Sequence, residues 1–123
     1  TPFTNYLPTG TAEVTYGYSD FIVTNRLGGT QAYQVLVAEG GSYADFTLAK
    51  VVEDKFTASK TDQRVIGANW RSGGGPTTLP SVRTDRFYVV KDAASNYYKV
   101  RFLAMSNEAG LRGNPTFEYA KLQ

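Results

Sequence analysis

A strict two-residue alternation over residues 97–105 constrains the fold more than any other feature of the sequence. Between Tyr97 and Met105 one set of side chains occupies every second position and is expected to face a core: Tyr98, Val100, Phe102 and Ala104. Only an extended chain places every second side chain on one side, because an α-helix repeats every 3.6 residues. No segment of about a dozen residues has the apolar spacing of three and four that an amphipathic helix requires. The sequence therefore predicts a domain built from β-strands.

Two further runs extend this strand into a meander. Arg86–Lys91 is rich in aromatic and β-branched residues, and the turn formers of residues 92–96 join it to the alternating segment. A third run, Thr116–Lys121, follows a predicted loop, Asn107–Pro115, that glycines and a proline interrupt. We expect these three runs to form consecutive antiparallel strands.

The first half of the chain contains less regular strand candidates. They are Glu13–Tyr18, Asp20–Thr24, Gln31–Ala38, Tyr43–Leu48 and Val51–Phe56. Residues 43–55 also contain alanines and lysines that favour helix, but their Phe, Thr and Val content favours strands. Asn69–Pro80 contains three consecutive glycines and two prolines, which predicts a long exposed loop. We therefore expect one all-β domain over residues 1–123, made of antiparallel hairpins and meanders.

The composition removes most catalytic and metal chemistry. The chain has no His and no Cys, which excludes disulfides, zinc and iron–sulfur sites and nucleophile systems that need either residue. Thirteen Lys and Arg against eleven Asp and Glu give a net charge of +2 without a basic cluster, so nucleic-acid binding is not expected. No run approaches the roughly 20 apolar residues of a membrane-spanning helix. Cysteine content does not distinguish the cytosol from bacterial export.

Three possible functional sites remain to be considered: a phosphate-binding loop, a pair of catalytic carboxylates and a calcium site. The glycine run before Pro76 lacks the Lys-Ser/Thr and helix of a P-loop, so a flexible or tight turn is favoured. The carboxylates show no pairing that singles out two of them for glycosidic chemistry, so we do not expect an enzyme. Asp45, Glu53 and Asp54 lack the loop pattern of a calcium site, so no metal site is predicted.

The absence of His and Cys leaves Tyr phenolate, Met thioether and Lys amine as axial donors to a haem iron. Packing on a sheet face accounts for most of the nine Tyr, and Met105 at a strand end is favoured as a core or rim residue. Tyr43 and Met105 are the two candidate donors that substitution would test. Trp70, beside Arg71, is either a stacking platform for a flat ligand or a lid over the sheet, and both interpretations stay open.

Several motifs in a fixed order resemble the C-terminal region of HmuY-type haem-binding lipoproteins. The motifs are Trp70 followed by Gly75-Pro76, then Arg86 to Asn96, then Lys99-Val100-x-Phe102, then Gly113 with Thr116-Phe117-x-Tyr119. Tyr18-Ser19-Asp20 leading into Asn25 to Gly29 resembles an earlier segment of that family. The resemblance covers most of the chain and is strongest from Trp70 onward.

The resemblance implies an all-β fold with a hand-like grip, and it implies no catalysis. It further implies a protein on, or shed from, the outer-membrane surface of anaerobic Gram-negative bacteria, where it captures haem and passes it to a TonB-dependent receptor. An N-terminal part of the full family domain, with the lipid-bearing Cys, is expected to precede residue 1. The alternative is an HmuY-like module with a non-haem ligand, or an accessory subunit of an outer-membrane transport complex.

The family pattern also implies two His ligands on loops, and this chain has neither. One position matches Gly74 or its neighbour, the other falls between residues 53 and 61, and Met105 matches neither loop. Without axial bonds, stacking, apolar burial and propionate pairing with Lys or Arg would hold a porphyrin. The candidate ligand-binding residues are Tyr43, Lys55, Lys60, Trp70, Arg71, Gly74, Pro76 and Met105, with the three cations expected to meet propionates.

Overall fold

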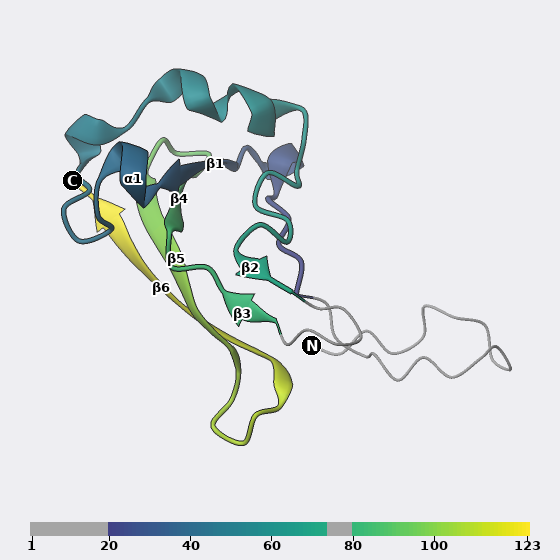
Figure 1. Cartoon of the computed structure of the whole chain (residues 1–123). Coiled ribbons are helices and arrows are strands. Elements are labelled where there is room, and N and C mark those ends of the chain that lie inside the picture. Colours follow the sequence, from purple (N-terminus) through teal and green to yellow (C-terminus); the bar gives the residue numbers. More distant parts are fainter. Residues whose placement is uncertain (1–19, 74–79) are drawn as a thin grey trace, which may run out of the picture.

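Four strands form one antiparallel sheet in the spatial order β1-β4-β5-β6 (Figure 1). The computed structural model describes residues 20–73 and 80–123, and the strands of this sheet are β1 (Gln31–Leu36), β4 (Arg86–Lys91), β5 (Tyr97–Ser106) and β6 (Arg112–Leu122). A second sheet pairs β2 (Arg71–Ser72) with β3 (Ser81–Val82). The helical elements are short: η1 (Arg26–Gly28), α1 (Val37–Gly40), η2 (Leu48–Lys50) and η3 (Glu53–Lys60). Antiparallel strands dominate, which confirms the predicted all-β class.

The predicted meander β4-β5-β6 is confirmed. The turn between β4 and β5 forms because the Asp92 carboxylate accepts hydrogen bonds from the backbone N–H groups of Ala94 (2.9 Å) and Asn96 (2.8 Å). Hydrogen bonds from Asn96 hold the pKa of Asp92 below its usual range. The turn sets the register in which Lys91 lies opposite Tyr97, and this register continues to Tyr88 opposite Val100.

Strand β6 begins earlier than predicted, so the loop Asn107–Pro115 is shorter than the sequence indicated. The Asn107 side chain accepts a hydrogen bond from the Leu111 backbone N–H (2.9 Å), and Gly110 adopts a positive φ of 78°. This compact turn lets Ser106 pair with Arg112, and irregularities in register lie between Phe102 and Ser106. The resulting β5–β6 hairpin extends well beyond the other strands (Figure 1).

The predicted strand Tyr43–Leu48 is wrong. The Lys99 ammonium donates hydrogen bonds to the carbonyl oxygens of Tyr43 (2.6 Å), Ala44 (3.1 Å) and Phe46 (3.1 Å). In a strand neighbouring carbonyls point in opposite directions, so carbonyls that converge on one cation require a turn instead. The local propensity of this segment is thus overridden by a lysine more than 50 residues away in the sequence.

Three other strand predictions need correction. Val51–Phe56 enters the 3₁₀ helix η3, because Phe56 is fully buried against Tyr33 with ring centroids 4.8 Å apart. Asp20–Thr24 contributes only an isolated bridge between Ile22 and Gly67. Gln31–Ala38 ends as a strand at Leu36 and continues into α1. The candidate Glu13–Tyr18 lies outside the described residues.

The four-stranded sheet has a hydrophobic core on each face. The helix-covered face packs against residues 43–56, and its buried core residues are Tyr33, Val35, Phe46, Phe56, Phe87, Val89 and Leu122. We call the opposite face the hairpin-covered face, because it packs against residues 65–70 and strand β3 of the β2–β3 pair. Its buried core residues are Ala32, Ile66, Trp70, Tyr88, Phe102 and Met105. The predicted alternation of β5 holds as far as Phe102, which faces the hairpin-covered core. Beyond it the register shifts, so Met105 joins the same core three positions later. Tyr97 on the opposite face also packs into a core.

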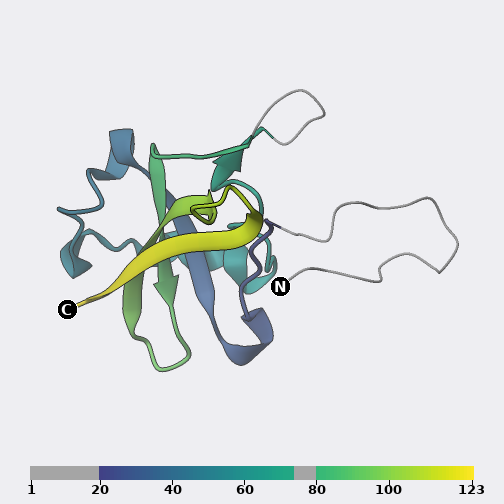
Figure 2. The same ribbon diagram turned by 90° about the horizontal axis from the view of Figure 1, so that it is seen from below.

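The two edges of the sheet differ. The outer edge of β1 is covered by η3, because the Ala32 backbone N–H donates to the buried Ser59 hydroxyl (3.1 Å). Seen from below, β6 crosses the near side of the molecule as the other edge (Figure 2). Among the described residues, no helix has the length and apolar character needed to span a membrane.

Candidate functional site

The base of the β2–β3 pair is the first component of the candidate site. Trp70 precedes β2, and its carbonyl accepts a hydrogen bond from the Arg83 N–H (2.9 Å). The Trp70 side chain is only 1% exposed and stacks on Phe102 with ring centroids 4.5 Å apart. Met105 lies in the same cluster and is 6% exposed. Of the two open interpretations of Trp70, the structure supports a lid over the sheet, and Met105 is a core residue.

Two buried donors in this cluster have no hydrogen-bond acceptor among the residues that the structure describes. The Trp70 indole Nε1 and the Tyr88 hydroxyl are both inaccessible to solvent and unpartnered. Burial raises the pKa of Tyr88 to about 12, so the hydroxyl keeps its proton at neutral pH. Leaving a buried donor unpaired costs about 1–3 kcal/mol, so a pair of them in one cluster is unusual.

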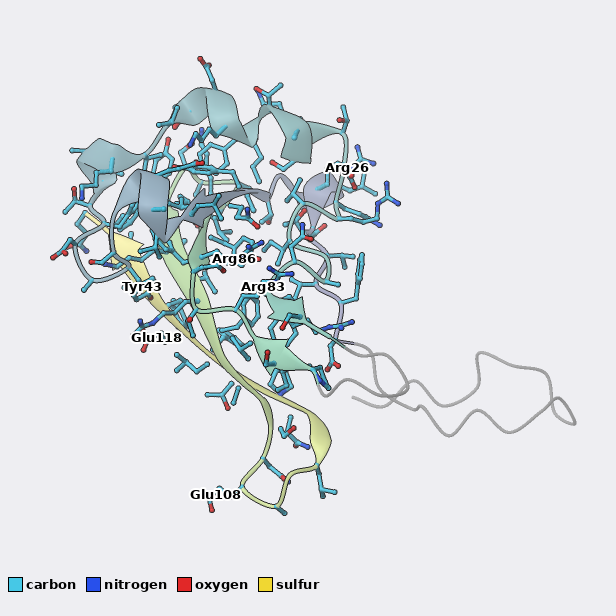
Figure 3. The ribbon with its side chains drawn as sticks, viewed as in Figure 1. Arg26, Tyr43, Arg83, Arg86, Glu108 and Glu118 are labelled. Atoms are coloured by element: carbon cyan, nitrogen blue, oxygen red, sulfur yellow. The ribbon has the colours of Figure 1, made fainter. Side chains whose placement is uncertain are left out.

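Three arginines border the same cluster, and they are used differently. Arg86 is held by Asp85 through two hydrogen bonds of 2.8 and 3.0 Å, and it also donates to Gln34 (3.2 Å). Arg71 donates to backbone carbonyls of residues 20 and 73, and the Arg83 Nε donates to the carbonyl of Arg71 (3.1 Å). Arg83 directly follows β3, and Arg86 is the first residue of β4; both are labelled in Figure 3. Arg86 is therefore neutralised by its neighbour, whereas the Arg83 charge has no carboxylate partner among the described residues.

An aromatic strip lies beside this cluster on the hairpin-covered face, and we define it as Tyr98, Phe117 and Tyr119. Phe117 is 54% exposed and Tyr119 is 65% exposed. Phe102 connects the strip to the core, because its ring lies 6.2 Å from that of Phe117 and also stacks on Trp70. The sequence reasoning missed this strip. The signal was present, since Phe117 and Tyr119 alternate on one face of an expected strand.

The structure divides the predicted site residues between the two faces. Trp70, Arg71 and Met105 come together at the hairpin-covered face. Tyr43 packs into the other core against Phe87, and its hydroxyl donates to the Lys99 carbonyl (3.3 Å). Its ring also lies beneath the Lys99 ammonium at 4.8 Å, and burial raises its pKa. The sheet stands between the two groups, so one flat ligand does not contact both.

The predicted cations Lys55 and Lys60 lie on η3, which packs against β1. Lys55 lies 5.9 Å from the centre of the Tyr33 ring, and the Lys60 carbonyl accepts a hydrogen bond from Arg26 (3.5 Å). Gly74 and Pro76 lie outside the described residues. Within the described ranges, no group of three or more Asp and Glu side chains is arranged to hold a metal ion.

Comparison with known proteins identifies the family. The fold and the two-faced sheet define an all-β domain of antiparallel strands. The chain matches the family described as "HmuY protein" over residues 6–119, and it belongs to this family. Its fold is similar to that of a solved structure titled "Crystal structure of Tannerella forsythia Apo HmuY analog (TFO)", with a TM-score of 0.55. The two sequences are 15% identical, and the match covers 94% of this chain and 70% of that chain. No curated protein matches it. The predicted family and fold are confirmed, and membership associates the chain with haem binding at the family level.

Proposed function

We propose that this chain binds haem or a related porphyrin on its hairpin-covered face. The observation that carries the proposal is the aromatic strip, because its exposed rings continue the buried stack of Trp70 and Phe102 to the surface. Flat aromatic ligands bind such surfaces through stacking and apolar burial. Arg83, which borders the Trp70 cluster, supplies a cation for a propionate. Membership of the HmuY family supports the same ligand class.

Axial ligation in this proposal is altered or absent. The chain has no His, Tyr43 lies on the other face, and Met105 is buried in the core. Stacking and carboxylate pairing then supply most of the affinity, so iron contributes little. We accordingly expect haem and iron-free protoporphyrin IX to bind with similar affinity.

The proposed setting is the outer-membrane surface, or the exterior as a shed protein, within a TonB-dependent haem-uptake system. Family membership supports this setting, in which the chain captures the ligand and passes it to the receptor. A second candidate is an HmuY-like module for a non-haem ligand, or an accessory subunit of a transport complex. The absence of every His from the chain is the observation that favours this second candidate.

A titration of the purified chain tests the proposal. Haem, oxidised and reduced, and protoporphyrin IX are titrated separately while the Soret band is followed. Phe117→Ala is expected to weaken both ligands about tenfold, because it removes an aromatic stacking surface. Leu48→Ala is the matched control, because Leu48 is a comparably exposed apolar residue on η2. A chain that shifts neither Soret band would contradict the proposal and leave the second candidate.

A further inference from the structure

The two unpartnered donors on the hairpin-covered face point to a specific ligand group. We propose that the Trp70 indole N–H and the Tyr88 hydroxyl, with Arg83 at their border, form a binding site for a carboxylate. This inference rests on the proposed function and deepens it, because it assigns the site to a propionate of the bound porphyrin. The site is distinct from the exposed aromatic strip, which contacts the ring.

Both donors pack against the same side chain. The Trp70 ring stacks on Phe102 at 4.5 Å, and the Tyr88 ring meets Phe102 edge-on at 5.9 Å. Tyr88 follows Arg86 by two positions on β4, which places the two side chains on the same face. The Arg83 backbone N–H donates to the Trp70 carbonyl (2.9 Å), and the Arg83 charge acts on the Tyr88 hydroxyl, where it opposes the rise in pKa. The donors and the cation therefore belong to one small region between β4, β5 and the β2–β3 pair.

The chemistry of this region favours an anion with two acceptor oxygens. Trp Nε1 is only a donor, and the protonated Tyr88 hydroxyl has no acceptor in the described part of the chain. Asp85 pairs with Arg86 through direct hydrogen bonds, whereas the exposed Arg83 acts on Asp85 only through its charge. Among the described residues, Arg83 has no carboxylate in ion-pair contact. Hydrogen bonds to a charged acceptor are about twice as strong as neutral ones. A carboxylate thus matches both the donors and the charge.

A purely structural role does not explain the Tyr88 hydroxyl. Phe at this position would fill the core without burying an unpaired donor, and buried Tyr and Trp side chains usually have a partner. Tyr88→Phe is therefore expected to leave the unliganded chain as stable as the wild type or more stable. Because both donor atoms are inaccessible to solvent, the proposed site requires β3, which contacts β5, to shift when the ligand binds. β3 is held to β2 by only two residue pairs.

The experiment compares protoporphyrin IX with its dimethyl ester, both delivered from the same nonionic micelles. The ester keeps the ring and loses both carboxylates. Tyr88→Phe is expected to weaken the diacid about tenfold or more and to leave the ester unchanged, because one hydrogen bond to a charged group is lost. Tyr97→Phe is the matched control, because its hydroxyl lies on the helix-covered face. Urea unfolding of both variants without ligand completes the comparison.

The outcomes separate this inference from the proposed function. Equal effects of Tyr88→Phe on diacid and ester, or a loss of unliganded stability from a lost internal hydrogen bond, would overturn the carboxylate site while porphyrin binding stands. If the wild type binds neither porphyrin, the proposed function fails, and benzoate becomes the probe. Trp70 is the single Trp, so its indole N–H gives one resolved NMR signal. A saturable benzoate shift of that signal, lost in Tyr88→Phe, would support the site, and no shift would overturn it.

Discussion

The two faces of the sheet bury aromatic residues to a similar extent but treat their polar atoms differently. On the helix-covered face, the Tyr33 hydroxyl accepts from the Val52 N–H (3.2 Å), and the Tyr43 and Tyr97 hydroxyls donate to Lys99 and Glu53. On the hairpin-covered face, the Tyr88 hydroxyl and the Trp70 indole N–H have no acceptor within residues 20–73 and 80–123. The Tyr33, Tyr43 and Tyr97 hydroxyls are hydrogen-bonded within the protein, so they need no ligand to supply a partner. A face that keeps unpaired donors beside exposed rings is suited to a ligand, and local departures from good packing are expected at functional sites.

The largest test of this contrast removes one aromatic ring from each face. Phe87 is 0% exposed and packs against Tyr43 and Phe46, so Phe87→Ala should lower the free energy of unfolding by about 3–5 kcal/mol. Phe117→Ala on the exposed strip should lower it by less than about 1 kcal/mol while weakening porphyrin binding. Urea unfolding followed by circular dichroism measures both changes. Similar losses of stability in the two variants would refute the assignment of separate roles to the faces.

A smaller effect is expected from the lysine that organises the helix-covered face. Lys99→Met leaves the carbonyls of Tyr43, Ala44 and Phe46 without their shared donor, which should cost about 2–3 kcal/mol of unfolding free energy. Lys121→Met makes the same change on the neighbouring strand, where the side chain is exposed, and should cost less than about 0.5 kcal/mol. If urea midpoints of the two variants coincide, Lys99 does not hold residues 43–46 in place.

The smallest effect concerns pH. A hydrogen bond from Tyr97 and then one from Lys91 hold the pKa of Glu53 below its ordinary value. A depressed carboxyl pKa contributes stability that is present above the unfolded pKa and is lost as pH falls through the folded pKa. Glu53→Gln should therefore flatten the decline of the urea midpoint between about pH 5 and pH 3.

Tyr97→Phe provides the matched variant for that titration. It keeps the Glu53 charge and its ion pair with Lys91 (3.0 Å) but removes the largest cause of the shift, so it should flatten the acid decline only in part. A wild-type decline that neither substitution alters would show that other carboxylates govern acid stability. Neither change should affect porphyrin selectivity, since both residues lie on the helix-covered face.

The prediction of the fold succeeded where local pattern and final structure agree. The alternation of residues 97–105 and the turn at Asp92 place β4 and β5 correctly, because both signals act between residues close in sequence. The strand prediction for residues 43–56 was wrong, because the conformation of this segment depends on Lys99 and on the burial of Phe56 against Tyr33. Such long-range contacts override local strand propensity.

The candidate site was predicted only in part for the same reason. Trp70 and Arg71 are consecutive in the sequence, but the sequence does not reveal that the sheet separates them from Tyr43. The sequence also does not reveal the hydrogen-bond partner of a hydroxyl group, so it predicts Tyr88 only as a strand residue. Unpaired donors become visible only when every neighbouring acceptor has been placed in three dimensions.

The sequence by itself determined an all-β chain without His or Cys, and it carried the motifs of the HmuY family. These properties depend on composition and on short-range periodicity, which need no knowledge of distant contacts. The tertiary structure decided on which face the tyrosine hydroxyls find hydrogen-bond partners, and which aromatic rings reach the surface. It also decided which buried donors remain unpaired among the described residues. Those properties arise when segments far apart in the chain pack together, since burial and hydrogen-bond partners exist only in the assembled core.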